Sequence, residues 1–393
     1  MSDRALVLID GEHYAPVVRD ALAAIPYEVV GALLVGGTEK LRGKDDYGVP
    51  LVDALDAVEA DLVVDLSDEP VLGPRERLLW ASRALALGLS YTGADFRFDP
   101  PPLHVVATPS LGVIGLGKRI GKTAVAGHVA RLLGRDRRVV VVAMGRGGPA
   151  EPELVETSPS LDDLLELSRS GRHAASDHLE AAALAGVPAV GCRRAGGGLA
   201  GATFDSNVLE GALLAEQLDP ELLVFDGSGA ALPPVDTDVR ILVTNGGHDP
   251  RAGLNAYRVL VSDLVVDTGD ADREAIRSIS DIPVVAAELR LRPAEPLRGR
   301  RTAVFTTGPA ATDGLDAEVV YISRNLARRE ALQQELERVE ADVYLVELKA
   351  AAIDVVAETA LARGAEVVLA ANDVVSDELD ERILSLVPDR SRA

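Results

Sequence analysis

Residues 113–124 read Val-Ile-Gly-Leu-Gly-Lys-Arg-Ile-Gly-Lys-Thr-Ala, and this stretch decides the fold of the central part of the chain. An apolar run enters it, glycines turn the chain, and a helix is expected from about Lys122. A strand, a glycine loop and a helix in this order surround phosphate groups with backbone N–H groups and a helix N-terminus. The sequence therefore predicts that Lys122 bridges the β- and γ-phosphates of ATP and that the Thr123 hydroxyl binds Mg²⁺.

The glycine spacing of this loop departs from the standard pattern. Position 116, where the first glycine is expected, is leucine, and glycines stand at 115 and 117 instead. The resulting Gly-x5-Gly-Lys-Thr spacing resembles the loop of dethiobiotin synthetase and its relatives among the P-loop enzymes. The residues predicted to hold the nucleotide in this loop are Gly115, Gly117, Lys118, Gly121, Lys122 and Thr123.

Two further residues follow predicted strands and complete the expected ATP site. Asp226 ends the apolar run 222–226 and precedes Gly-Ser-Gly, which is the placement of a Walker-B carboxylate that holds Mg²⁺ directly or through water. Asn245 follows the strand expected at 240–243, and its amide could read the adenine edge, since it offers both a donor and an acceptor. The alternative for Asn245 is a turn-forming role before Gly246 and Gly247.

The whole chain alternates short apolar runs with helical stretches, which is typical of parallel α/β sheets. We predict a P-loop sheet domain at 104–297, flanked by two smaller Rossmann-like α/β domains at 1–103 and 298–393. In the first block, strands are expected at 5–9, 28–35 and 61–66, and helices from about His13, Pro50 and Pro74. In the second block, strands are expected at 112–115, 138–143, 189–191, 222–226, 240–243 and 264–267. In the third block, they are expected at 303–306, 319–323, 344–347 and 366–370.

Composition narrows the class of protein. The formal charge of −22 argues against a general nucleic-acid binder, because phosphate backbones require a basic surface. No apolar run reaches the roughly 18–20 residues that span a bilayer, and the single cysteine, Cys192, excludes an internal disulfide. The expectation is a cytoplasmic protein without nucleic-acid or membrane partners. The sequence leaves the oligomeric state open, a homodimer included.

Glycine-rich loops after two of the predicted strands carry arginines. Ligands of open α/β sheets bind beyond the carboxyl ends of strands, and bare glycine backbone lets an anion approach an arginine closely. We therefore predict a substrate-binding role for Arg146, Arg193 and Arg194, and a catalytic role for the last two beside Lys122 and Asp226. His178, with Glu180 on the helix before the second loop, is a further candidate for substrate binding, whereas Cys192 is interpreted as a packing residue.

The first block has its own polar cluster at the end of its first strand. Residues 9–16 read Ile-Asp-Gly-Glu-His-Tyr-Ala-Pro, and Asp10, Glu12 and His13 are predicted to bind substrate. The alternative for Asp10 is capping of the next helix. Residues 36–40 and 65–69 close the next two strands and outline a second polar cleft.

Four motifs, in this order, resemble the cyclic 2,3-diphosphoglycerate synthetase family. They are Leu-Ile-Asp-Gly-Glu-His-Tyr-Ala-Pro-Val at 8–17, Gly-Lys-Arg-Ile-Gly-Lys-Thr at 117–123, Gly-Cys-Arg-Arg at 191–194 and Phe-Asp-Gly-Ser-Gly-Ala-Ala-Leu-Pro-Pro at 225–234. The resemblance implies an enzyme that uses ATP and Mg²⁺ to form an intramolecular phosphoanhydride in 2,3-diphosphoglycerate, releasing ADP and phosphate. It also implies that Lys122, Thr123 and Asp226 serve ATP and Mg²⁺.

Two other functions remain open from the sequence. A P-loop kinase or ligase for another small phosphorylated acid would use the same loop. A ParA-like regulatory ATPase is the alternative from another class, but it should show a basic surface or an amphipathic membrane helix, and the sequence offers neither.

Overall fold

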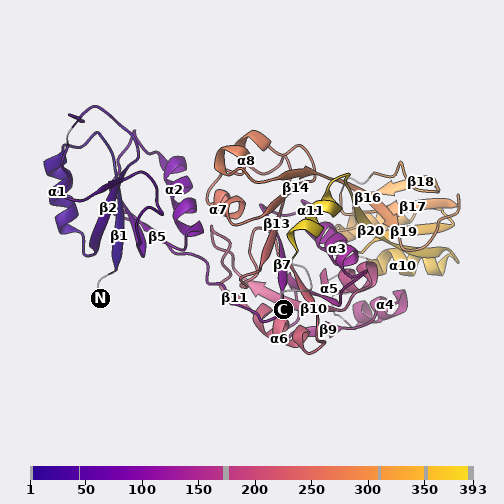
Figure 1. The fold of residues 1–393 in the computed structure, drawn as a ribbon. Helices are drawn as coiled ribbons and strands as arrows, with labels where there is room; N and C mark the ends of the chain where they lie inside the picture. Colours follow the sequence, from indigo (N-terminus) through magenta and orange to yellow (C-terminus); the bar gives the residue numbers. More distant parts are fainter. Residues whose placement is uncertain (1–2, 44, 171–176, 309–310, 349–352, 388–393) are drawn as a thin grey trace. The chain divides into compact units, whose positions relative to one another are not determined.

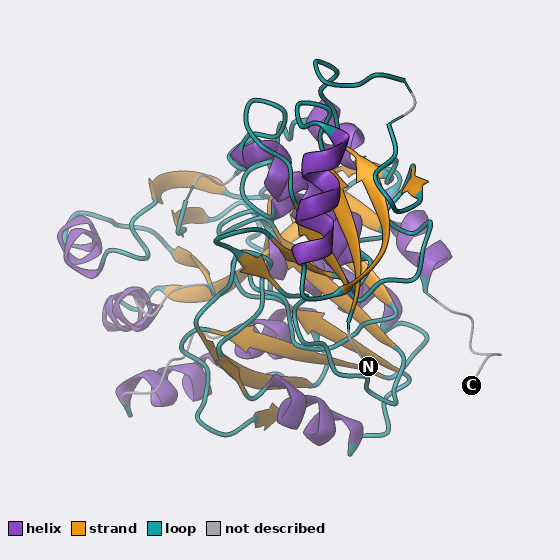
Figure 2. Ribbon diagram, turned by 90° about the vertical axis from the view of Figure 1, so that its left-hand side faces the viewer, coloured by secondary structure: helices purple, strands orange, loops and turns teal. Residues whose placement is uncertain are grey.

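The computed structural model describes residues 3–43, 45–170, 177–308, 311–348 and 353–387. The chain contains both helices and strands (Figure 2), which alternate along the sequence. The strands form three mostly parallel sheets. The chain divides into two compact units. The first comprises Met1–Pro102, Asp249–Val261 and Asp272–Ile282, and the second comprises Leu103–His248, Ser262–Ala271 and Pro283–Ala393.

The first unit is built on a six-stranded sheet with the strand order β3-β2-β1-β4-β5-β6. Its elements in chain order are β1 (Arg4–Ile9), α1 (Ala15–Ala24), β2 (Glu28–Leu34), β3 (Leu51–Val52), β4 (Leu62–Asp65), α2 (Pro74–Ala86), β5 (Ser90–Thr92) and β6 (Arg97–Phe98). Prolines in the first turns of α1 and α2 favour these helix starts, since proline is already fixed near helical φ. The two helices lie on opposite sides of the strands (Figure 1). Two further helices, α7 (Asn255–Leu260) and α8 (Arg273–Ile279), belong to this unit, and α7 packs against α2.

The prediction of a helix from about Pro50 is wrong. Leu51 and Val52 instead form β3, which pairs in parallel with β2, and turns follow as far as residue 60. The Ala32 N–H donates to the Pro50 carbonyl at 2.9 Å. Pairing with the exposed edge of β2 therefore overrides the helical periodicity of this short segment.

The central sheet of the second unit carries the glycine loop. Its strands run in the order β11-β10-β8-β12-β7-β13-β14-β15, and β9 pairs with β10. They are β7 (Ser110–Gly115), β8 (Val139–Gly145), β9 (Glu153–Val155), β10 (Ala189–Ala195), β11 (Asp205–Ser206), β12 (Leu222–Asp226), β13 (Val239–Thr244), β14 (Leu264–Asp267) and β15 (Val284–Ala286). The helices of this part are α3 (Lys122–Leu133), α4 (Leu161–Arg169), α5 (Asp177–Glu180), the π-helix η1 (Ala181–Ala185) and α6 (Val208–Glu216). Every residue of β7 is buried, as expected of a central parallel strand with helices on both faces.

The third sheet, also in the second unit, has the order β16-β20-β19-β17-β18. Its elements are β16 (Glu288–Pro293), β17 (Arg301–Phe305), β18 (Glu318–Ser323), α9 (Arg329–Leu336), β19 (Val343–Glu347), α10 (Ile353–Ala362), β20 (Glu366–Val375) and α11 (Leu379–Leu386). The helix α3 packs against both the central sheet and β20, so one apolar core joins the two sheets. The three-domain division remains a prediction, because each block has its own sheet whereas the last two share this compact unit.

Candidate active site

The loop between β7 and α3 has the geometry expected of a phosphate-binding loop. The chain turns at Gly121, whose φ of 85° lies in the left-handed region that favours glycine. A Cβ atom on Gly115 would lie 2.6 Å from Ile120 Cδ1 and 2.8 Å from Lys122 Cδ, so a side chain there would displace the side chains of Ile120 and Lys122. Thr268 Oγ1 donates a hydrogen bond to the Ile120 carbonyl at 2.9 Å and fixes the loop to the end of β14. The strand, loop and helix predicted from the sequence are thus present with the helix starting at Lys122.

Lys122 is held inside this loop. Its side chain is nearly buried, and Nζ donates to the Gly117 carbonyl at 2.8 Å. Burial lowers the pKa of Lys122, and the carboxylates of Asp226 and Asp177 oppose that shift. The charge of Lys122 therefore costs free energy in the folded protein, and an anionic ligand in the loop would offset that cost.

Asp226 lies beside the loop because β12 is the direct neighbour of β7. Asp226 is in register with Val113 and is 2% exposed. In the described part of the chain no group of three His, Cys, Asp or Glu residues is placed to hold a metal ion. The oxygen donors near the loop, the Asp226 carboxylate and the Thr123 hydroxyl, suit magnesium, since Mg²⁺ binds one or two protein oxygens and takes its remaining ligands from water and nucleotide phosphates. Thr123 at the start of α3 and Asp226 are the residues that would hold it.

Cationic side chains from three separate segments of the chain converge on Gly229, in the loop after β12. A Cβ atom on Gly229 would lie 3.0 Å from Arg146 Nη2, 3.4 Å from Arg194 Nη2 and 3.8 Å from Lys118 Cγ. Arg146 follows β8, Arg194 belongs to β10 and Lys118 comes from the phosphate loop. We call Lys118, Arg146 and Arg194 the arginine cluster.

Among the residues that the structure describes, none neutralises the arginine cluster through an ion pair. Across the described ranges, its three side chains form no ion pair with a carboxylate. Arg194 donates instead to backbone carbonyls, those of Gly196 and, at 2.9 Å, Ser228. Burial and, secondarily, the neighbouring Arg146 charge lower the pKa of Arg194. In a chain with a net charge of −22, such an uncompensated group of cations indicates a binding site for an anion.

Arg193 and Arg194 are separated by the geometry of their strand. The sequence places them in a loop after the strand, but β10 extends to Ala195 and includes both. Side chains alternate between the two faces of a strand, so the two arginines project in opposite directions. The backbone N–H of Arg193 donates to Asn207 Oδ1 at 2.6 Å, and its side chain is exposed. The structure thus brings Arg194, and not Arg193, to Arg146.

His178 lies behind β10. It is 4% exposed, and its ring occupies the space that a side chain on Gly191 would need, since a Cβ atom there would lie 2.4 Å from His178 Nδ1. The substrate-binding role assigned to His178 stays a prediction, and its burial supports a packing role.

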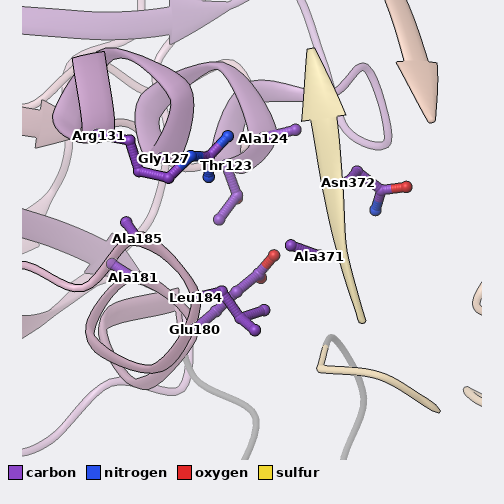
Figure 3. A pocket seen from close by; sticks show the side chains of 10 residues that line it. All are labelled: Thr123, Ala124, Gly127, Arg131, Glu180, Ala181, Leu184, Ala185, Ala371 and Asn372. Atoms are coloured by element: carbon purple, nitrogen blue, oxygen red, sulfur yellow. The ribbon is translucent and has the colours of Figure 1, made fainter. Parts of the chain in front are cut away.

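A small cavity separates the start of α3 from η1 and β20. Figure 3 shows the Glu180 carboxylate pointing toward the α3 side, where Thr123, Gly127 and Arg131 line the opposite wall. The cavity volume of about 20 Å³ is enough for about one water molecule. This space therefore accommodates no nucleotide or substrate.

Asn245 forms a turn, and the turn brings a histidine against the loop. Asn245 Oδ1 accepts a hydrogen bond from the Gly247 N–H at 3.0 Å and lies 3.1 Å from His248 Nδ1. His248 Nε2 lies 1.9 Å from where a Cβ atom on Gly117 would be. A role for His248 was not predicted from the sequence, although the residue directly follows two glycines in a turn at a strand end, which is a usable signal. The adenine-reading role of Asn245 stays a prediction.

Replacement of Gly117 by alanine is expected to weaken ATP binding about five- to tenfold, because the new methyl group overlaps the His248 ring, so the ring or the loop has to shift. Gly117 does not have a left-handed φ, so the clash and not the backbone limits alanine here. Calorimetry with a nonhydrolysable ATP analogue measures the effect. The matched control is the double variant Gly117→Ala/His248→Ala, which removes the clash and should recover most of the affinity. Normal binding by Gly117→Ala alone would contradict this account of the loop.

The remaining predicted substrate-binding residues, Asp10, Glu12 and His13, lie in the first compact unit. There they form a hydrogen-bonded cluster at the end of β1. Asp10 accepts the Glu12 N–H at 2.9 Å, which is a turn contact rather than a bond to a helix terminus.

Three family models match the chain. They describe the N-terminal domain of cyclic 2,3-diphosphoglycerate synthetase at residues 4–99, its P-loop domain at 110–286 and its C-terminal domain at 293–373. The chain is 47% identical to the cyclic 2,3-diphosphoglycerate synthetase of Rubrobacter xylanophilus, over 98% of this chain and 97% of that protein. It is 41% identical to that of Thermococcus kodakarensis, with 94% of both chains covered, and 37% identical to that of Methanothermus fervidus, with 98% and 96% covered.

Among solved structures, the chain is similar to LpxK from Aquifex aeolicus in complex with ATP. The likeness covers 73% of this chain and 90% of that chain at 17% identity, with a TM-score of 0.45. In the described residues, no helix is both long enough and apolar enough to cross a membrane.

Proposed function

This chain belongs to the cyclic 2,3-diphosphoglycerate synthetase family, and from that premise we propose how its phosphate loop and arginine cluster work together. The reaction joins the two phosphates of 2,3-diphosphoglycerate through an intramolecular anhydride and converts ATP to ADP and phosphate. The phosphate loop binds ATP through Lys122 and Thr123. The arginine cluster binds the phosphates of the substrate beside it.

One observation carries the assignment of the substrate site. Arg146 and Arg194 meet at Gly229 together with Lys118, a residue of the phosphate loop itself, and no carboxylate of the described chain forms an ion pair with them. A guanidinium can donate two parallel hydrogen bonds to one phosphate, so two arginines suit a substrate with two phosphates. The contact with Lys118 supports a substrate position next to the γ-phosphate of ATP.

The first step is phosphoryl transfer. An oxygen of one substrate phosphate attacks the γ-phosphorus in line, a new P–O bond forms, and the bond to ADP breaks with its electron pair going to the ADP oxygen. Lys122 and Lys118 stabilise the charge on the transferred group, and Arg194 orients the attacking phosphate. Phosphate oxygens are already deprotonated and nucleophilic, so the step needs no general base.

The second step closes the ring. An oxygen of the other substrate phosphate attacks the phosphorus that now carries the extra phosphoryl group, and inorganic phosphate leaves. Arg146 and Arg194 hold both phosphates in one site, which makes the attack effectively unimolecular. Magnesium, when bound at Thr123 and Asp226, supplies charge neutralisation on the phosphate oxygens.

The proposal also covers where the enzyme is located in the cell and what it binds. Use of ATP and a single buried cysteine, Cys192, support a cytoplasmic location. Burial raises the pKa of the Cys192 thiol to about 12, which keeps it protonated and inert at neutral pH. The proposed partner is the small anionic substrate, and the number of subunits is left open.

A substrate panel tests the proposed function. The purified protein with Mg-ATP is expected to release ADP slowly until 2,3-diphosphoglycerate is added, and then at least about tenfold faster, because only this substrate supplies both the nucleophile and the second phosphate. The matched controls are 2-phosphoglycerate and 3-phosphoglycerate, each of which lacks one phosphate. Stimulation by either of these compounds and not by 2,3-diphosphoglycerate would identify a kinase and overturn the proposal.

A further inference from the structure

The strand order of the first unit reverses at β1. From β1 the chain proceeds to β2 and β3 on one side, and then returns to β4 and β5 on the other side of β1. In open α/β sheets, ligands bind at such a switch point, beyond the carboxyl ends of the two central strands. The loops that follow β1 and β4 therefore form the expected binding edge of this sheet.

These loops present a histidine oriented by a buried carboxylate. Asp10, directly after β1, is fully buried, and its Oδ1 lies 2.7 Å from His13 Nδ1. The His13 side chain remains 35% exposed. Its Nδ1 is engaged by Asp10, so the second ring nitrogen is the one left to bind a ligand.

The acidic side chains of the cluster are occupied by internal hydrogen bonds. Asp10 Oδ2 accepts the Asp68 N–H at 2.7 Å, which ties the β1 loop to the β4 loop. Glu12 Oε1 accepts the N–H groups of Thr38 and Glu39 at 3.1 and 3.3 Å, which ties the β1 loop to the β2 loop. Three loops are thus tied together, and the carboxylates of Asp10 and Glu12 both accept hydrogen bonds within the cluster.

Cationic groups gather at the same edge. Tyr14, next to His13, is half exposed, and Arg42 and Lys40 lie over its ring at 5.6 and 5.7 Å from the centroid. Lys40 pairs with Glu39, whereas Arg42 forms no ion pair within the residues that the structure describes. His13 and Arg42 therefore remain as the groups available to an anion.

A buried hydroxyl points to a ligand independently. Tyr47 is 3% exposed, and its hydroxyl has no hydrogen-bond partner in the described chain. Tyr47 packs in one apolar cluster with Ile9, the last residue of β1, which places it at this end of the sheet. Burial first, and then the charges of Asp45 and Asp10, raise the pKa of Tyr47. A buried hydroxyl without a partner costs free energy that a bound ligand would recover.

From these observations we propose that the first unit binds a small organic phosphate through His13 and Arg42, at the switch point between β1 and β4. The choice of 2,3-diphosphoglycerate as the ligand rests on the proposed function. The site itself rests on the geometry of the first unit alone. It gives the N-terminal domain a binding role that does not depend on the phosphate loop.

The ring resonances of His13 provide a local test. The full-length Arg146→Met/Arg194→Met variant disables the arginine cluster, and comparison with the same variant carrying His13→Gln assigns the His13 signal among the six histidines. Addition of 2,3-diphosphoglycerate is expected to shift the His13 signal to saturation. Inorganic phosphate and ATP, as separate probes, should shift it far less. An unmoved signal, or an equal response to inorganic phosphate or ATP, would overturn the proposal.

Two further variants in the same background measure the contribution of individual groups. Arg42→Met is expected to weaken the ligand about tenfold, whereas Arg83→Met, at the far end of α2 over Trp80, should leave binding unchanged. Without ligand, the melting temperature of Tyr47→Phe should be no lower than that of its parent. The affinity of Tyr47→Phe for the ligand should be several-fold lower. Unchanged affinity in both Arg42→Met and Tyr47→Phe would contradict the site. The readout needs no turnover, so this proposal and the catalytic one can fail separately.

Discussion

Lys122→Met is expected to reduce ADP formation by roughly 10²–10³-fold, because one cation that stabilises the transferred phosphoryl group is lost. Lys122 sits in the loop with Nζ on the Gly117 carbonyl, ready to exchange that contact for a phosphate oxygen. Steady-state ADP release in the presence of 2,3-diphosphoglycerate measures the effect. Near-normal turnover by a folded variant would show that this loop is not the catalytic site.

The stability of the same variant provides its control. Burial lowers the pKa of Lys122, so between that lowered value and the ordinary 10.5 the unfolded chain binds more protons than the folded protein. The free energy of unfolding of the natural protein therefore rises with pH through this window, and the cost of the buried charge is largest below it. At neutral pH, the melting temperature of Lys122→Met is expected to equal or exceed that of the natural protein. This difference in melting temperature should shrink as the pH rises toward 10.5. A variant that is inactive because it is unfolded would show a large loss of melting temperature instead.

Arg194→Met is expected to lower the affinity for 2,3-diphosphoglycerate at least about tenfold, equivalent to ~1.4 kcal/mol, and to leave ATP affinity nearly unchanged. Charge-assisted hydrogen bonds contribute roughly 1.5–3 kcal/mol each, and lysine lacks the planar fork that binds phosphate at two points. Arg194→Lys should therefore restore the affinity only in part. Calorimetry with the substrate, and separately with a nonhydrolysable ATP analogue, measures both affinities.

Arg193→Met is the matched control for Arg194→Met. It removes the same charge from the next position of the same strand, but from the face opposite to Arg146. We expect its substrate affinity to stay within about twofold of the natural protein. Equal losses in the two variants would indicate a general electrostatic effect. Loss of ATP binding in Arg194→Met would place this arginine in the nucleotide site.

The parts of the fold that follow from local sequence could be predicted well. The loop at 113–124 combines a buried strand, required glycines and a helix start, so a single segment carries all the information. The segment after Pro50 could not be predicted in the same way. Its apolar residues satisfy a helical period, but the open edge of β2 supplies hydrogen-bond partners that lie about 20 residues away in the sequence.

The sequence could predict candidate residues within single loops, but not which residues of different loops lie close together. Arg146 lies between two glycines and Arg194 shortly precedes three, so the sequence marks both segments. Their meeting point at Gly229, however, belongs to a third segment and depends on the order of the strands. The difference between Arg193 and Arg194 depends on β10 continuing to Ala195, and strand ends are poorly defined by sequence. The close approach of His248 to Gly117 likewise requires β13 to lie beside β7.

Phosphorus NMR of the products tests the central claim most directly. The protein, Mg-ATP and 2,3-diphosphoglycerate are incubated together, and the signals of ADP, inorganic phosphate and the substrate phosphates are followed in one spectrum. We predict equal amounts of ADP, inorganic phosphate and a new cyclic anhydride, with the two phosphate signals of the substrate lost in parallel. ADP formation with a phosphorylated acid as the product and no release of inorganic phosphate would contradict the account, because it would show phosphoryl transfer without ring closure.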